Sequence, residues 1–162
     1  MSTFEIPDDH VARRIAVDVA MIRMLRGQPH VGLIRRKNEP HVGKLALPGG
    51  RQKPEDRDAL DAACREVKEE TGVEVDRKEL DLLEFLDASG RDPRPGVPHV
   101  SVVFWAIIND ERGEAPQAGD DADSFEWFPL RDATEDIMAF DHFLAIAKIR
   151  QRLSLCCHGC CT

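Results

Sequence analysis

The chain has 162 residues, 42% hydrophobic and 32% charged, which are ordinary proportions for a globular protein of one domain. Its net charge of −8 argues against binding to a nucleic-acid backbone, which calls for an excess of Lys and Arg. A small phosphorylated substrate stays compatible with this charge, because a bound metal ion inverts the charge at its site. There is no long apolar run and no charged-then-apolar leader, so we expect neither a membrane span nor a secretory signal, and a cytoplasmic location.

The N-terminal part of the chain predicts an irregular segment followed by a strand. Residues 1–11 show no clear period, whereas apolar side chains alternate over residues 14–22. Such alternation is typical of a strand with one buried face. The side chains expected on that face are Ile15, Val17, Val19 and Met21.

A second strand is predicted over residues 30–36, after a turn at residues 26–29. It ends in Arg35 and Arg36, with Lys37 directly after them. Guanidinium groups bind phosphate oxygens in bidentate pairs, so Arg35 and Arg36 are candidate substrate-binding residues. A solvated strand end is the alternative.

Residues 38–44 predict a loop, and residues 45–47 a short strand that leads into Pro48-Gly49-Gly50. We expect these glycines to turn the backbone sharply and to bring main-chain groups close to the next helix, predicted over residues 59–71. The apolar stripe expected to face the core consists of Leu60, Ala63, Cys64 and Val67. Candidate caps are Asp56 or Asp58 at the start of the helix and Gly72 at its end.

Three carboxylates share the neighbouring face of this helix. Glu66 and Glu70 lie one turn apart, since each residue advances by about 100°, and Glu69 lies beside them. Like charges at this spacing repel each other, and a hard divalent cation would relieve the repulsion. Mg²⁺ prefers oxygen ligands and is usually shared with substrate phosphates. A solvated, Glu-rich helix face is the alternative, which the Pro-Gly-Gly sequence upstream disfavours.

This stretch resembles the signature box of the Nudix hydrolases. The family pattern is Gly, five residues, Glu, seven residues, Arg-Glu, an aliphatic residue, any residue, Glu-Glu, any residue, Gly and an aliphatic residue. Residues 65–73 match its second half, and Gly50 matches the opening glycine. The segment between them is one residue too long, so the first glutamate falls on Asp56 counted forward and on Arg57 counted back. Whether Glu55 or Asp56 replaces that carboxylate stays open.

The resemblance implies an α/β (α+β) fold in which a mixed β-sheet lies between helices as an α/β/α sandwich. It also implies a Mg²⁺-dependent enzyme, with Mn²⁺ as a substitute, in which water attacks one phosphorus of a pyrophosphate. The implied metal ligands are Glu66, Glu69, Glu70 and the carbonyl oxygen of Gly50. Arg65 is expected to anchor the glutamates through a bidentate ion pair.

The proton of the attacking water must pass to a carboxylate, either a box glutamate or a group from outside the box. Relatives often supply the outside group from a late loop or strand. The candidates here are Glu126, Asp120, Asp121 and Asp123. We favour Glu126, because it alternates out from the side that carries Phe125 and Trp127.

The rest of the chain predicts strands and one closing helix. The expected elements are a strand at 80–88, a rigid loop at 91–96, a central strand at 99–108, a polar turn at 110–118, an acidic loop at 119–123, a strand at 124–130, a connector at 137–141, and a helix that Asp141 caps and that ends at Leu153. We expect residues 1–153 to form one domain and the Cys-rich residues 154–162 to form a disordered tail. A zinc or copper site in that tail is the alternative.

Four strings resemble ADP-ribose pyrophosphatase-like Nudix proteins: RRKNEPHVGKLALPGG, RDPR, GDDA and AFDH. Arg91 and Arg94 are expected to reach phosphate or a terminal ribose, and Asp141 or His142 to bond sugar hydroxyls. The alternative for both arginines is a salt-bridged loop. We therefore expect a nucleoside diphosphate substrate, foremost ADP-ribose or a related nucleotide sugar.

Three other functions stay open. The longer box loop and the pair His41-x-Gly43 look like features of coenzyme A diphosphatases. A nucleoside triphosphate pyrophosphatase would need fewer sugar contacts. A regulator that only binds nucleotides would usually lack box carboxylates, whereas all three glutamates of REVKEE remain. The expected partner is a small nucleotide, with no nucleic acid and no membrane, and a homodimer stays a candidate.

Overall fold

In the computed structural model, residues 13–88, 90–96, 98–109 and 122–158 are described, with residues 122–123 and 155–158 described by their backbone alone. Seven strands form one sheet in the order β3-β2-β1-β6-β5, with β4 paired to β1 and β7 to β2. Their bounds are β1 Arg14–Leu25, β2 Gln28–Arg36, β3 Leu45–Ala46, β4 Gly49–Arg51, β5 Asp81–Leu86, β6 His99–Ile107 and β7 Ala122–Pro129. β1 and β6 run parallel and the other pairs antiparallel, so the sheet is mixed, as predicted.

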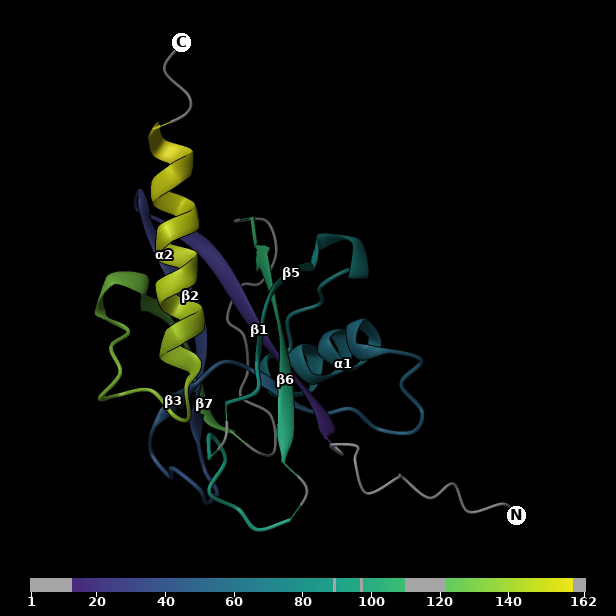
Figure 1. Cartoon of the computed structure of the whole chain (residues 1–162). Coiled ribbons are helices and arrows are strands. Elements are labelled where there is room, and N and C mark those ends of the chain that lie inside the picture. The colour runs from purple at the N-terminus through teal and green to yellow at the C-terminus, as the bar shows by residue number, and fades with distance from the viewer. Residues whose placement is uncertain (1–12, 89, 97, 110–121, 159–162) are drawn as a thin grey trace.

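Two α-helices cover the sheet, α1 (Ala59–Thr71) and α2 (His142–His158) (Figure 1). A short 3₁₀ turn, η1 (Arg77–Glu79), lies between α1 and β5, and a second, η2 (Leu130–Asp132), lies between β7 and α2. Each helix packs on its own apolar cluster. Val17, Val19 and Met21 of β1 lie in the cluster under α1. Ala20 and Ile22 lie in the cluster under α2. Because these residues alternate along one strand, the two helices lie on opposite faces of the sheet.

β1 is buried on both faces, so the prediction of a half-buried strand is wrong. Its alternate residues Asp18, Ala20 and Ile22 are at most 8% exposed. Ile15, predicted to be buried, is 43% exposed. The central position of β1 in the sheet explains this burial, since β1 has neighbours along both edges and a helix over each face.

Gly49 and Gly50 begin strand β4, where a sharp turn was predicted. The strand pairs with residues 16–18 of β1, and neither glycine has a positive φ. A Cβ atom on Gly49 would lie 2.1 Å from the carbonyl oxygen of Val17. Glycine is therefore required here by close approach of two backbones.

α1 has the predicted bounds, and its caps follow from its flanking residues. The Asp58 side chain accepts a hydrogen bond from the Asp61 N–H at 3.0 Å, so Asp58 and not Asp56 is the N-cap. Gly72 ends the helix with a φ of 71°. Of the predicted core stripe, Ala63 and Val67 are fully buried.

The start of α2 is fixed beside β3. Leu45 forms a parallel bridge with Met138, and the Ala139 N–H donates to the Leu45 carbonyl at 2.7 Å. This pairing extends the sheet edge and brings residues 140–142 next to the strand that enters the box. α2 continues to His158, so its predicted end at Leu153 is wrong.

Several predictions fall on residues outside the described ranges: the segment 1–11, the polar turn 110–118, Asp120 and Asp121, and Gly159 to Thr162. β7 already begins at Ala122, so the end of the predicted acidic loop is strand. No helix in the described part of the chain has the length and apolar character that crossing a membrane requires.

Candidate functional site

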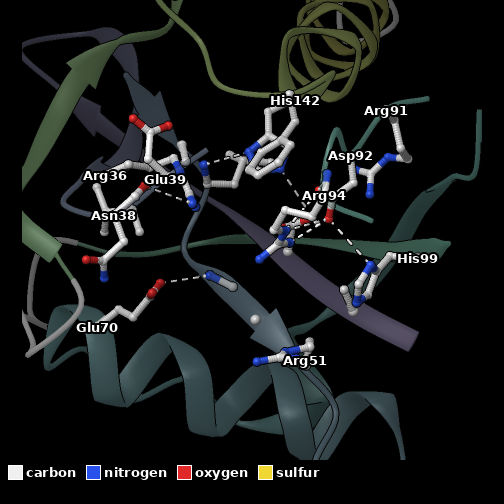
Figure 2. A pocket seen from close by; sticks show the side chains of 18 of the residues that line it. Arg36, Asn38, Glu39, Arg51, Glu70, Arg91, Asp92, Arg94, His99 and His142 are labelled. Carbon is white, nitrogen blue, oxygen red and sulfur yellow. Dashed lines mark hydrogen bonds and ion pairs between the residues drawn. The ribbon is translucent and has the colours of Figure 1, made fainter. Parts of the chain in front are cut away.

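A cavity of about 310 Å³ opens where β1, β3 and β4 meet the end of α1 and the start of α2 (Figure 2). Arg36, Asn38 and Glu39 lie on one side of it, and Arg91, Arg94 and His99 on the other. Glu70 of α1 and His142 of α2 also line this cavity. The cavity thus joins one box glutamate to the arginines predicted to bind substrate.

Arg65 donates hydrogen bonds to three carboxylates in or next to the box helix. Its Nε and Nη2 donate to the two carboxylate oxygens of Asp56, at 2.9 and 2.8 Å. Its Nη1 donates to Glu66 at 2.7 Å and to Glu69 at 3.1 Å. The predicted bidentate pair with the glutamates is therefore wrong: the fork faces Asp56, and the glutamates share one nitrogen. These hydrogen bonds from Arg65 are the main reason that the pKa of Asp56 falls from 3.8 to about 2.

Glu66 and Glu70 bracket the two glycines of β4. Glu66 is 8% exposed, and a Cβ on Gly50 would lie 2.5 Å from its Oε1. Glu70 Oε2 accepts the Gly49 N–H at 2.9 Å, the bond drawn from α1 to β4 in Figure 2. Burial raises the pKa of Glu66, although its hydrogen bond from Arg65 opposes the shift.

Glu69 is the outermost of the three glutamates. Its side chain is 49% exposed and lies 3.1 Å from Arg65 and 3.6 Å from Lys53. Its charge adds to the forces that raise the pKa of Glu66. The box therefore holds two inner carboxylates against the glycines and a third that faces solvent.

The donor set fits a hard divalent cation. No three carboxylate, imidazole or thiolate groups converge within the described residues. A magnesium-like ion does not require that, because it binds one or two carboxylates and takes its remaining ligands from water and phosphate. Glu66 and Glu70 supply oxygen donors, and the absence of a Cβ at Gly50 leaves its main chain open to Glu66. A cation here would also offset the free-energy cost of burying the charge of Glu66.

The predicted substrate-binding arginines fall into two groups. Arg36, Arg91 and Arg94 line the cavity, whereas Arg35 does not. Arg36 donates to the Pro40 carbonyl at 2.8 Å, and its guanidinium lies 4.9 Å from the centre of the Phe140 ring. Main-chain and aromatic partners hold Arg36 in place while leaving its positive charge for a ligand.

Arg91 and Arg94 are held by carboxylates. Arg91 forms three hydrogen bonds with Asp141, and both side chains are nearly buried. Arg94 donates to Asp92, at 2.9 Å from Nε to Oδ1. Both oxygens of Asp141 are thus engaged by Arg91, an arrangement closer to the salt-bridged alternative than to free sugar contacts.

Glu126, predicted as the general base, is not brought to the box. It lies on β7 between Phe125 and Trp127, whose side chains pack in the cluster under α1. Glu126 therefore points to the opposite face, where it lies 3.4 Å from Arg35. Asp123 is also in β7, in the part of that strand that is described by its backbone alone.

Asp18, Ser101 and His142 form a buried polar group in the cavity wall that the sequence reasoning missed. Ser101 donates to Asp18, and the His142 Nε2 lies 3.4 Å from the same carboxylate oxygen. Burial acts to raise the pKa of Asp18, but His142 and Ser101 together hold it below its ordinary value. The sequence signal was a lone carboxylate in an otherwise apolar strand.

Comparison with known proteins finds relatives over most of the described residues. The family model described as NUDIX domain matches residues 12–149 of this chain. An ADP-ribose pyrophosphatase of Methanocaldococcus jannaschii is 39% identical over 124 residues, which are 76% of this chain and 68% of that protein. The ADPR-responsive transcriptional repressor NtrR of Acinetobacter baylyi is 31% identical over 147 residues, 90% of this chain; the chain spans only 56% of that repressor.

A similar solved structure carries a ligand. The NUDIX domain of Shewanella oneidensis NrtR, complexed with ADP ribose, superposes with a TM-score of 0.78 at 27% identity. The match covers 92% of this chain and 94% of that one. Its fold agrees with the predicted sandwich of helices around a mixed sheet.

Proposed function

Since the chain belongs to the NUDIX domain family, we propose that it is a Mg²⁺-dependent hydrolase of ADP-ribose or a related nucleotide sugar. The observation that carries the proposal is one cavity lined by Glu70, Arg36, Arg91 and Arg94. It combines carboxylate donors for a cation with guanidinium groups for a diphosphate. The 39% identity to an ADP-ribose pyrophosphatase favours that substrate among nucleoside diphosphates.

Each part of the site has a distinct task. When bound, Mg²⁺ would neutralise phosphate charge and lower the pKa of the attacking water. Glu66, Glu70 and the Gly50 carbonyl would hold the ion, with Glu69 completing the set. Arg65 fixes the glutamates through its hydrogen bonds and does not touch substrate.

Arg36 binds a phosphate oxygen from the opposite wall, because its charge has carbonyl and aromatic partners but no carboxylate within hydrogen-bond distance among its described contacts. Arg91 and Asp141 act together, as an ion pair that shapes the cavity beside the start of α2. Arg94 lies in the same wall and contacts the distal sugar or its phosphate. A box glutamate accepts the proton from water, since Glu126 points to the other face of β7.

A nucleotide-binding regulator is the second candidate. The similarity to the NtrR repressor over 90% of this chain favours it. The box glutamates favour catalysis, because Glu66 and Glu70 are both placed against the glycines of β4. We propose further that the protein works in the cytoplasm on a small nucleotide, with no nucleic acid as partner, and that a homodimer is its candidate assembly.

Product analysis by mass spectrometry tests the choice of substrate. Purified protein with Mg²⁺ is incubated in parallel with ADP-ribose, coenzyme A and a nucleoside triphosphate. AMP and ribose phosphate from ADP-ribose alone are expected. Cleavage of coenzyme A instead would show that the longer box loop is the informative feature. Tight ADP-ribose binding without turnover of any substrate would favour the regulator.

A further inference from the structure

Three buried polar side chains lie between the start of α2 and the segment that leads into β4, the strand with the box glycines. Ser101 is fully buried, His142 is 4% exposed and Asp18 is 8% exposed. Ser101 Oγ donates to Asp18 Oδ2, and His142 Nε2 lies 3.4 Å from that oxygen. These residues come from β6, β1 and α2, so the group joins the sheet to α2 beside the cavity.

The imidazole of His142 has a defined orientation. The Leu47 N–H donates to His142 Nδ1 at 3.1 Å. Nδ1 is therefore an acceptor, and in this arrangement the ring proton is on Nε2, facing Asp18. His142 thus accepts the Leu47 N–H through Nδ1 and faces the Asp18 carboxylate through Nε2.

Three successive residues after β3 are each bonded to a different element. Leu47 bonds to His142 of α2. The Pro48 carbonyl accepts the Val19 N–H of β1 at 2.8 Å. The Gly49 N–H donates to Glu70 of α1 at 2.9 Å.

Asp18 also contacts this segment directly. A Cβ on Gly49 would lie 2.5 Å from Asp18 Oδ1, so the carboxylate packs on the Gly49 backbone. The hydrogen bond to Glu70 Oε2 is kept only while the Gly49 N–H stays in place. The position of Glu70 thus depends on the Leu47–Gly49 segment, which Asp18 and His142 contact.

We propose that Asp18 and His142 are positioning residues for the divalent cation: they hold the Leu47–Gly49 segment so that Glu70 and the Gly50 carbonyl face one point. The inference rests on the proposed function, since it requires that the box bind a cation. Replacing a residue that orients a metal ligand without binding the metal typically lowers metal affinity or activity by about 10- to 100-fold.

The test compares two variants of His142. His142→Leu removes both ring nitrogens, whereas His142→Gln keeps an amide oxygen that can accept the Leu47 N–H and an amide N–H that can donate to Asp18. Mn²⁺ affinity is measured by electron paramagnetic resonance of the free ion, without substrate, and the thermal midpoint is measured without metal. Arg150→Met serves as the control, because Arg150 of α2 bonds only the main-chain carbonyls of Leu130 and Ala133 among its described contacts.

His142→Leu is expected to weaken Mn²⁺ binding by about 10- to 100-fold, and His142→Gln to recover it to within about 3-fold of wild type. Arg150→Met should lower the thermal midpoint and leave Mn²⁺ affinity unchanged. If His142→Leu does not fold, Asp18→Asn replaces it, with the same expected loss of affinity. Wild-type Mn²⁺ affinity in the folded variant, with only a lower midpoint, would overturn the inference alone. Wild-type protein that binds no Mn²⁺ would overturn the proposed function as well.

Discussion

Arg65 and Asp56 form a bidentate ion pair, with Nε–Oδ1 and Nη2–Oδ2 distances of 2.9 and 2.8 Å. Asp56 precedes α1, whereas Arg65 lies in its middle, so the pair ties the box loop to the helix. The carboxylate that replaces the first box glutamate is therefore Asp56, the residue found by counting forward from Gly50. The shorter Asp side chain and the additional loop residue together place a carboxylate against the arginine fork.

Replacing Asp56 by Asn should reduce turnover by about 10- to 100-fold, because Arg65 loses the partner that orients it toward Glu66 and Glu69. The matched control is Glu55→Gln, since Glu55 is the neighbouring carboxylate and is exposed. Steady-state kinetics with ADP-ribose measures both variants. Equal losses in the two variants would mean that the box loop is not organised by this pair.

The same pair should make the protein sensitive to acid. The pKa of Asp56 is about 2 in the folded protein, below its ordinary 3.8, so its stabilising contribution is present above about pH 4 and is lost as the pH falls toward 2. The difference in free energy of unfolding between wild type and Asp56→Asn should therefore shrink over that range. Urea unfolding at several pH values checks it; a difference independent of pH from about 5 to 2 would contradict this assignment.

Glu69→Gln and Glu70→Gln should each lose most turnover while the fold survives. Each substitution removes a charge that the cation needs and keeps the side-chain volume, so losses of at least about 10- to 100-fold are expected. Glu74→Gln is the control, because Glu74 forms an exposed pair with Lys68 beyond the helix end. Near-normal activity of either box variant would remove that residue from the metal site.

Arg36→Gln and Arg35→Gln separate the two adjacent arginines that the sequence could not rank. Arg36 lines the cavity, whereas Arg35 bonds the Gly43 carbonyl and lies near Glu126 on the other face. Loss of a charged hydrogen bond to phosphate should raise KM for ADP-ribose by about 10-fold or more in Arg36→Gln. The KM of Arg35→Gln should stay close to wild type. The reverse ranking would place the phosphate on the other side of β2.

The helix and the shared face of its glutamates could be predicted because their signals are local. The apolar stripe, the Asp58 and Gly72 caps and the spacing of the glutamates lie within one continuous segment. The family prediction is confirmed, and so is the mixed sheet between helices.

Other features depend on contacts between distant residues and left no local pattern. Strand β4 exists because β1 lies alongside Gly49 and Gly50, and the double burial of β1 depends on both helices. The buried group of Asp18, Ser101 and His142 joins three elements through single polar contacts. Alternation along one strand cannot distinguish a solvent-facing carboxylate from one that faces a buried imidazole.

The glutamates of α1 are proposed to hold a cation that promotes hydrolysis of a diphosphate. The most direct measurement is AMP release from ADP-ribose by wild type and Glu70→Gln, each with Mg²⁺ and with a chelator. Wild type with Mg²⁺ is expected to release AMP and ribose phosphate. Wild type with the chelator should release neither, and Glu70→Gln should release them at a much lower rate. Equal release with and without Mg²⁺, or by both proteins, would contradict this proposal.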